Sequence, residues 1–597
     1  MNLKEAVRTL WFKEKEQGDN NQLTTRWGRE LDPGKVLTEY PRPQLQRDNY
    51  TILNGYWDYA ITSTVGKPER FDGQILVPFS PESVLSGVNR QLKPDEILWY
   101  RRVLPVEHKY PGKRLILHFG AVDQSCEVFL GEQKVAEHIG GYLPFSVDIT
   151  KDIEEGDNIL TLKVIDVSDT SYHSRGKQML NRGGMFYTAQ SGIWQTVWYE
   201  WVSDNYITSL KLTPDIVKGE LDIQISMNEQ YRKKHLYQVV VKEQGRSINS
   251  VSSDQPSITV KLDHIRYWSP EDPFLYELTV IVEEDRIESY FAMRDFSIQP
   301  DADGRLRIFL NGNPYFQNGL LDQGYWPDGL YTPPSDEAMI YDITMAKRLG
   351  YNMLRKHIKI EPLRWYYHCD RLGVIVWQDM VNGGEAYSLL LVSYLPTIFP
   401  KLAARINDKR YGLFGRSSEQ GRWEWSMECK ETVELLYNCP CIACWVPFNE
   451  GWGQFDAKEA YRLIKELDST RLIDHASGWF DQRIGDFESI HNYFHPLKVH
   501  RRNRPVIFSE IGGYACYIKE HSFSRKIYGY KIYKTDRELN DAYQKLFREE
   551  LTELVRAGLS AVVYTQLTDV EDEVNGLLTY DREICKVDSI SDIEWRL

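Results

Sequence analysis

The stretch Trp445-Val446-Pro447-Phe448-Asn449-Glu450-Gly451-Trp452 is an apolar run that leads directly into a glutamate. A second run of the same kind, Val506-Ile507-Phe508-Ser509-Glu510-Ile511-Gly512-Gly513, follows later in the chain. If each run is a strand of a parallel barrel, its last side chains point into the mouth that the connecting loops enclose. The two runs therefore predict a barrel that presents the carboxylates of Glu450 and Glu510 at one rim.

Around these two runs, short apolar segments alternate with helical ones from residue 298 to 597. The segments expected as strands are Tyr315–Leu321, Asn352–His357, Val374–Asp379, Cys441–Asn449, Leu472–His475, Ser489–Tyr493, Val506–Glu510 and Ala561–Gln566. The segments expected as helices are Asp336–Leu349, Pro362–Leu372, Glu428–Tyr437, Asp456–Leu467 and Asp536–Gly558. This alternation predicts a (β/α)8 TIM barrel, in which the two glutamates end the fourth and seventh strands. The long connection Gly383–Gly421 predicts an insertion over the barrel mouth.

The first half of the chain is β-rich. From about residue 40 to 203, period-two runs such as Arg114–Phe119 and Ile159–Val164 alternate with turn residues, which predicts a jelly-roll-like β-sandwich over 1–203. Residues 204–297 hold further strand candidates, and some seven strands in about ninety residues are typical of an immunoglobulin-like sandwich. We therefore expect three domains, 1–203, 204–297 and 298–597.

The net charge of −14 argues against a nucleic acid or an anionic membrane as partner, because both would be repelled. The 17 tryptophans and 37 tyrosines fit a carbohydrate binder, since sugar C–H faces pack on aromatic rings, but β-rich proteins also carry many aromatics. The N-terminus lacks a run of signal-peptide character and no run has membrane-spanning length, so we expect a cytoplasmic protein.

The cysteine pattern agrees with a reducing compartment. Eight cysteines are sparse for 597 residues and lie mostly within apolar runs. Cys441 and Cys444 form a C-x-x-C, but no second pair or histidine pair accompanies them. We therefore interpret these two residues as part of the strand that leads to Glu450 and predict no metal site.

Two carboxylates at one rim fit glycosidic bond cleavage, because one must protonate the leaving oxygen while the other attacks the anomeric carbon or activates water. Several short strings, in order along the chain, strengthen this interpretation. They are Pro41-Arg42-Pro43, Leu53-Asn54-Gly55-Tyr56-Trp57, Leu98-Trp99-Tyr100-Arg101-Arg102, Ser191–Trp198, Arg355-Lys356-His357, Trp377-Gln378-Asp379, Asn449-Glu450 and Phe508-Ser509-Glu510. With them the chain resembles glycoside hydrolase family 2, which includes β-galactosidases, β-glucuronidases and β-mannosidases.

The resemblance implies that Glu450 is the general acid/base and Glu510 the nucleophile of a retaining double displacement. It also implies that Asn449 holds the sugar 2-hydroxyl and that Tyr493 donates a hydrogen bond to the nucleophile. The further candidates for substrate binding are Arg355, His357, Asp322, Asp379, Trp479, Tyr564 and Gln566. No cofactor is required by this mechanism.

The expected charge states follow from the neighbours of each glutamate. Glu450 must keep its proton near neutral pH, and Phe448 and Trp452 on either side predict the apolar surroundings that raise a carboxyl pKa. Glu510 must stay ionised, and Arg355 at the end of the second strand could supply the cation.

The sugar stays open at this point. A β-glucuronidase of the family is expected to carry an Asn-x-Lys pair after the nucleophile, but here such pairs occur only at Asn2-Leu3-Lys4 and Asn407-Asp408-Lys409. A uronic acid is thereby disfavoured without being excluded. We expect an exo-acting, β-galactosidase-like enzyme, with β-glucuronidase, β-mannosidase and arabinofuranosidase or galactofuranosidase as alternatives; the oligomeric state stays open, with a homo-oligomer as one candidate. A non-catalytic carbohydrate-binding protein is the alternative from another class.

Overall fold

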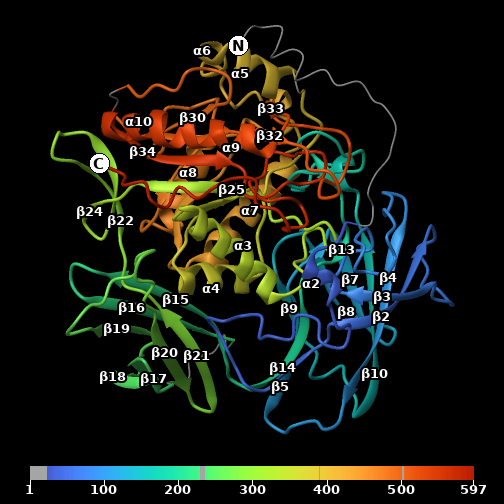
Figure 1. Ribbon diagram of the computed structural model, residues 1–597. Helices are drawn as coiled ribbons and strands as arrows, with labels where there is room; N and C mark the ends of the chain where they lie inside the picture. Colours follow the sequence, from blue (N-terminus) through green and yellow to red (C-terminus); the bar gives the residue numbers. More distant parts are fainter. Residues whose placement is uncertain (1–22, 229–234, 389, 501–502) are drawn as a thin grey trace.

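The protein is described from a computed structural model, which covers residues 23–228, 235–388, 390–500 and 503–597 (Figure 1). The N-terminal stretch on which the expected cytoplasmic location rests, including Asn2-Leu3-Lys4, lies outside these residues. Within the described part of the chain, no helix is both long enough and apolar enough to cross a membrane.

The first domain is the predicted β-sandwich. One sheet has the order β1 (Tyr50–Ile52), β14 (Val197–Ser203), β5 (Lys113–Phe119) and β9 (Phe145–Asp148). The other has the order β3 (Gly73–Val77), β2 (Gly55–Thr62), β4 (Ile97–Val106), β10 (Gly156–Ile165), β7 (Ser125–Leu130) and β8 (Gln133–Ile139). Alternate residues of β7 are buried, as period two requires, and they join one core between the sheets.

The second domain is the predicted immunoglobulin-like sandwich of seven strands. A sheet of β15 (Ile207–Asp215), β16 (Glu220–Met227) and β19 (Ser257–Lys261) faces a sheet of β18 (Arg246–Ser253), β17 (Tyr237–Glu243), β20 (Tyr276–Val282) and β21 (Asp285–Phe291). A hairpin of β22 (Phe296–Pro300) and β23 (Leu306–Leu310), with β24 (Asn313–Pro314), then leads to the barrel. The predicted boundary at residue 297 falls inside β22, because the strand pattern continues through this hairpin.

The third domain holds an eight-stranded parallel sheet that curls into the predicted barrel (Figure 1). Its order is β29 (Leu472–Ile473), β28 (Ile442–Val446), β27 (Ile375–Asp379), β26 (Met353–Lys356), β25 (Gln317–Asp322), β34 (Leu559–Thr565), β31 (Val506–Gly512) and β30 (Glu488–Asn492). Each predicted strand overlaps one of these. Side chains complete the ring between β29 and β30, where Ser489 Oγ donates to Asp474 Oδ2 over 2.7 Å.

The outer helices are α3 (Asp336–Leu349), α4 (Leu363–Leu372), α7 (Glu419–Leu436), α8 (Ala457–Leu467), α9 (Asp536–Lys545) and α10 (Thr552–Ala557). A π-helical turn, Leu546–Leu551, interrupts what the sequence predicts as one helix over 536–558. α7 begins earlier than predicted, because Ser418 Oγ accepts from Gly421 N and caps it. Among the described residues, loops without helices follow β29, β30 and β34, so the helical layer is incomplete.

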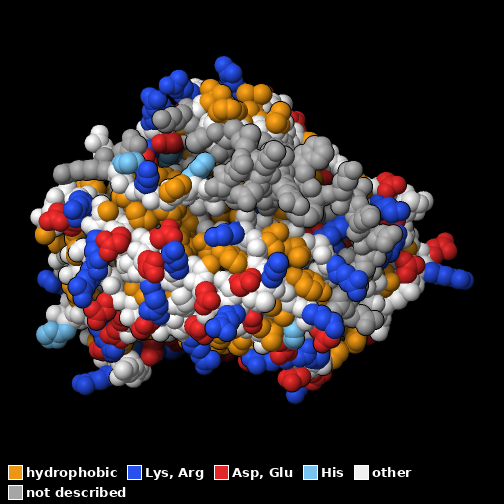
Figure 2. All heavy atoms as spheres, turned by 45° about the horizontal axis from the view of Figure 1, so that its top comes forward, with side chains coloured by type: hydrophobic (Ala, Val, Ile, Leu, Met, Phe, Trp, Pro, Cys, Tyr) orange, Lys and Arg blue, Asp and Glu red, His pale blue; other side chains and the backbone are white. Residues whose placement is uncertain are grey.

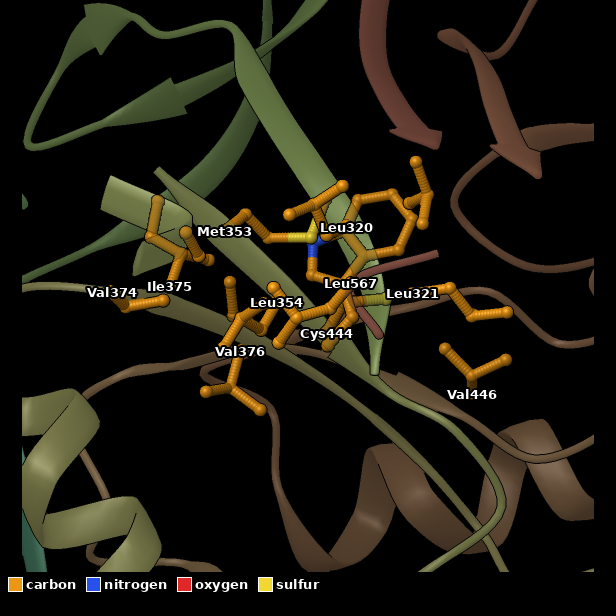
Figure 3. Packing of buried hydrophobic residues seen from close by; sticks show 14 of the residues in the cluster. Leu320, Leu321, Met353, Leu354, Val374, Ile375, Val376, Cys444, Val446 and Leu567 are labelled. Atoms are coloured by element: carbon orange, nitrogen blue, oxygen red, sulfur yellow. The ribbon is translucent and has the colours of Figure 1, made fainter. Parts of the chain in front are cut away.

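Residues that are partners in register on neighbouring barrel strands point together toward the helical layer. Leu320 of β25 pairs in register with Leu354 of β26, which pairs with Val376 of β27. Figure 3 shows these three side chains within one apolar cluster. Since successive residues point to opposite faces, the odd-numbered neighbours on β26 and β27 face the barrel interior.

The predicted insertion packs at the carboxyl ends of the strands. It contains η2 (Leu390–Tyr394), α5 (Leu395–Ile398), α6 (Pro400–Ala403) and η3 (Tyr411–Phe414). Val392 and Phe414 from this insertion form a buried cluster with Ile358, next to His357, and with Trp452, two residues beyond Glu450. The insertion therefore lies over the mouth, as the sequence predicted. Figure 2 shows cationic and anionic side chains interspersed over the face turned to the viewer.

Candidate active site

Glu450 and Glu510 meet at the rim of the barrel, with His491 between them. Nδ1 of His491 lies 2.8 Å from Oε1 of Glu450, and its Nε2 lies 3.6 Å from Oε1 of Glu510. One oxygen of each glutamate lies within 4.8 Å of the other, and all three side chains are buried. Such a close approach fits a retaining pair, whose carboxyl groups are about 5–5.5 Å apart, better than an inverting pair, whose carboxyl groups are about 6.5–9.5 Å apart.

A tight turn aims Glu450 at this point. Its φ of 52° and the 76° of Gly451 are both in the left-handed region, and a Cβ on Gly451 would meet the ring of Phe480 at 2.6 Å. The Glu450 amide donates to Ser477 O over 3.0 Å, which fixes the turn against the loop after β29. A non-glycine residue held in this region is uncommon and is typical of functional sites.

Arg355 connects the site. Its Nη1 donates to Glu510 Oε1 over 3.1 Å, and its Nη2 donates to Asn449 Oδ1 over 2.9 Å. Its Nε and Nη2 also bind both oxygens of Asp379, at 2.9 and 3.0 Å. The guanidinium is fully buried and therefore rigid. Because Asn449 Oδ1 accepts from Arg355, the amide nitrogen of Asn449 is the group left to donate to a ligand.

Tyr493 holds the second oxygen of Glu510. Its hydroxyl donates to Oε2 over 2.5 Å and lies 2.9 Å from Oγ1 of Thr565 on β34. Its ring stacks on Tyr530 at 3.6 Å between centroids, which fixes the phenol. Glu510 is thus held at both oxygens, as a nucleophile that must be aligned requires.

The two glutamates have opposite pKa shifts. Burial raises the pKa of Glu450, a hydrogen bond from His491 opposes this, and the Glu510 charge adds to the rise. Burial would also raise the pKa of Glu510, but its electrostatic interactions with the neighbouring His491 and Arg355 and the hydrogen bond from Tyr493 outweigh it and lower that pKa. Two carboxylates whose pKa values diverge in this direction suit an acid and a nucleophile.

His357 and Asp379 lie at the site, but Asp379 acts through its neighbours. Nδ1 of His357 is 2.7 Å from Asp379 Oδ2, so His357 and Arg355 together use both oxygens of Asp379. Burial lowers the pKa of His357 well below its ordinary value, which leaves a neutral ring. We expect Asp379 to position Arg355 and His357 rather than to bind substrate, a correction to its expected role.

Asp322 and Tyr564 are directed away from the mouth, contrary to the sequence expectation. Asp322 Oδ2 accepts from Lys356 Nζ over 2.6 Å, and that ammonium lies 4.2 Å from the ring of Trp365 on α4. Tyr564 packs on Tyr543 of α9 at 5.5 Å between centroids. Both residues stand at strand positions whose parity faces the helical layer, so they are not pocket residues.

Trp479 and Gln566 remain candidates. Trp479 is half-buried, with its ring 5.9 Å from that of His491. Gln566 Nε2 donates to Asn575 Oδ1 over 2.7 Å, while its buried Oε1 has no partner. Asn382 after β27 and Trp452 after Glu450 likewise bury polar atoms without a partner. Buried polar groups normally have partners, so these unpaired atoms indicate a place for a polar ligand.

Sequence reasoning missed His491 and Lys177. His491 precedes Tyr493 by two residues on β30, so period two was a signal that places it on the same face. Lys177 comes from the first sandwich, and its ammonium lowers the pKa of both Glu450 and His357. No local pattern marks Lys177, because its contacts are to residues far along the chain.

Metal binding is the competing interpretation of this cluster. Among the described residues, Glu450, His491 and Glu510 form the group whose ligand atoms could converge on an ion. Arg355 and Tyr493 already bind both oxygens of Glu510, and a cation there would have to displace them. Cys441 and Cys444 are buried, and burial raises the pKa of both thiols, which disfavours the thiolates that metals bind.

Sequence comparison finds the same family in each part of the chain. Residues 50–198 match the sugar binding domain of glycosyl hydrolases family 2, residues 205–294 match a further domain of that family, and residues 334–514 match its TIM barrel domain. A β-galactosidase of Thermoanaerobacter pseudethanolicus is 28% identical over 63% of this chain and 48% of its own length. A putative β-glucuronidase of Formosa agariphila is 26% identical over 47% of this chain and 34% of its length.

The chain thus spans about half or less of these two relatives. Among solved structures, the β-D-glucuronidase of Dictyoglomus thermophilum superposes with a TM-score of 0.70 at 16% identity, over 91% of this chain and 96% of that one. Such a likeness shows the fold. Because the three domain matches occur in order over most of the chain and agree with the observed sandwiches and barrel, the chain belongs to glycoside hydrolase family 2.

Proposed function

We propose that the chain is a retaining exo-β-glycosidase that removes a terminal sugar by double displacement. The observation that supports this most strongly is the pair Glu450 and Glu510, buried, with an oxygen of each within 4.8 Å and with opposite pKa shifts. The insertion over the mouth favours a pocket that is closed at one end. Such a pocket accepts the end of an oligosaccharide rather than its interior.

In the first step, ionised Glu510 attacks the anomeric carbon while protonated Glu450 gives its proton to the leaving oxygen. Arg355 and Tyr493 hold Glu510 in line with the anomeric carbon. The hydrogen bonds that they donate weaken as the Glu510 carboxylate loses its charge to the new covalent bond. Asn449 donates to the 2-hydroxyl, a contact that strengthens in the oxocarbenium-like transition state. In the second step, Glu450 takes a proton from water, and the water oxygen bonds to the anomeric carbon as the bond from that carbon to Glu510 breaks. The water attacks from the face that the leaving group occupied, which gives net retention.

The terminal sugar that the chain removes is β-linked, with a β-galactoside as the first candidate from the sequence. The relatives include a β-galactosidase and a putative β-glucuronidase, so a β-glucuronide is the second candidate. Cytoplasmic location and homo-oligomer formation remain predictions from the sequence.

The test is release of nitrophenol from a panel of nitrophenyl α- and β-glycosides by wild type and by Glu510→Gln. We expect release from a β-linked sugar by wild type alone, with the β-anomer as the first product detected by NMR. If wild type and Glu510→Gln release product equally, Glu510 is not the nucleophile. If wild type binds sugars but releases none, the chain is a carbohydrate-binding protein. Loss of activity with a chelator and its return with a divalent cation would favour the metal interpretation.

A further inference from the structure

The first sandwich sends a loop to the mouth of the barrel. Arg175 N and Gly176 N both donate to Asn382 O, at 3.1 and 2.7 Å, and Ser174 forms a β-bridge with Gly383. Asn382 follows the end of β27 by three residues, close to Asp379. The loop is therefore fixed to the barrel rim by its backbone, and it places the next residue, Lys177, at the mouth.

Lys177 differs from the other deeply buried lysines in having no acceptor. Lys356 Nζ donates to Asp322 and to Glu361, and Lys359 Nζ donates to Glu361 and to two carbonyls. Lys177 is 6% exposed, yet in the described part of the chain its ammonium has neither a hydrogen bond nor an ion pair. An ammonium at the end of a largely buried side chain, with no anion bound to it, can accept an anionic ligand without first losing an ion pair.

The groups around Lys177 also offer donors. Its ammonium lies 5.3 Å from the ring centroid of Trp452 and 5.6 Å from that of Tyr187. Trp452 Nε1 is buried without a partner, and an indole N–H can only donate. An ammonium and an indole N–H together suit a ligand group with several acceptor oxygens and a negative charge.

The position of Lys177 beside Trp452 places that ligand group close to Glu450. Trp452 follows Glu450 by two residues, and the Lys177 charge acts on both Glu450 and His357, which stand on different strands of the rim. A group held by Lys177 would lie within the pocket that also contains the two glutamates.

We propose that Lys177 selects glycosides whose terminal sugar carries a negatively charged group, a carboxylate or a sulfate ester. This inference rests on the proposed glycosidase function and extends it to the substrate class. It also changes the expectation drawn from the missing Asn-x-Lys pair after Glu510. Here the positive charge comes from the first sandwich domain, where no pattern near the nucleophile could reveal it.

The test compares wild type, Lys177→Met and Lys177→Arg on nitrophenyl β-galactoside, β-glucuronide, β-galacturonide and β-galactoside 6-sulfate. Methionine keeps most of the length that packs on Trp452 and removes the charge. We expect wild type to prefer one anionic glycoside, and we expect Lys177→Met to lower its anionic-to-neutral ratio of kcat/KM by about 10- to 100-fold. Lys177→Arg should retain much of that ratio. Whether the uronides or the sulfate ester respond identifies the anion.

Lys134→Met is the matched control, since Lys134 lies on β8 with its ammonium paired to exposed glutamates. It should leave the ratio unchanged. A wild type that prefers the neutral galactoside, with the same ratio in Lys177→Met, would overturn the inference while the glycosidase function stands. Thermal unfolding of each variant shows whether a change reflects loss of fold.

A binding measurement separates the inference from the reaction. Glu510→Gln is titrated calorimetrically with free glucuronate, galacturonate, galactose and galactose 6-sulfate, with and without Lys177→Met. Binding of an anionic sugar that needs Lys177 supports the inference even if no glycoside is hydrolysed, in which case only the proposed function fails. Equal binding of neutral and anionic sugars in both variants would refute the inference.

Discussion

Arg355 and Lys356 are neighbours on β26, yet they stand at the centres of two buried charge clusters with different properties. Toward the helical layer, Lys356 pairs with both Asp322 and Glu361, and Lys359 pairs with Glu361, all at 2.9 Å or less. Toward the mouth, Arg355 forms ion pairs with Asp379 and Glu510, while Glu450 contacts His491. The first cluster has balanced charges, whereas the second holds two carboxyl groups whose pKa values are shifted in opposite directions.

The difference teaches that burial of charge does not by itself mark a functional site. Both clusters are buried to a similar degree and both include hydrogen-bonded ion pairs. What distinguishes the mouth is the divergence of the pKa values of Glu450 and Glu510. Changes in the inner cluster should therefore affect turnover, and changes in the outer cluster should affect stability.

The largest effect is expected from Glu510→Gln. The amide keeps the shape and can still accept from Tyr493, but it cannot form the glycosyl-enzyme bond, so kcat should fall by at least about 10⁴-fold. The measurement is nitrophenol release from the preferred glycoside, with thermal unfolding to show that the fold is retained. Residual activity within tenfold of wild type would remove Glu510 from the mechanism.

The next effect concerns the outer cluster and should appear in stability. Glu361 accepts from Lys356 at 2.8 Å and from Lys359 at 2.9 Å, so Glu361→Gln leaves a buried positive charge uncompensated. Loss of one partner of a buried pair costs about 3–5 kcal/mol, which urea unfolding would detect. Glu583→Gln is the matched control, because its ion pair with Arg29 is exposed and contributes only about 0–1 kcal/mol. Equal destabilisation by both would contradict the contrast between the clusters.

A smaller effect is expected at Tyr493. Tyr493→Phe keeps the stack on Tyr530 and removes the donor to Glu510 Oε2. The loss of one hydrogen bond to a charged group corresponds to about 10- to 100-fold in kcat. Because Tyr530→Phe leaves that hydrogen bond in place, it should change kcat much less. If the two variants lose activity equally, the hydrogen bond from Tyr493 is not what positions Glu510.

The sequence predicted the framework of this site better than its side chains. The eight apolar runs became the eight barrel strands, because burial on both faces leaves a clear signal. The two misplaced candidates, Tyr564 and Asp322, lie at strand positions whose side chains point outward. Tyr564 is one residue before Thr565, which faces the mouth, and Asp322 pairs with Lys356 on the outer face. Parity could also have found His491, two residues before Tyr493. Lys177 could not be found, since only the folded chain brings the first sandwich to the rim.

The smallest effect is a shift in pH dependence. The active form has Glu450 protonated and Glu510 ionised, so kcat/KM should rise with pH through the lowered pKa of Glu510 and fall through the raised pKa of Glu450. The Lys177 charge lowers the pKa of Glu450, so Lys177→Met should move the alkaline limb to higher pH and leave the acid limb in place. The profile is measured on a neutral glycoside, where the loss of anion binding does not enter. Removal of a nearby cation can only favour the protonated form of Glu450 and so raise its pKa. An alkaline limb that moves to lower pH, or two limbs that move together, would therefore show that Lys177 does not act on Glu450.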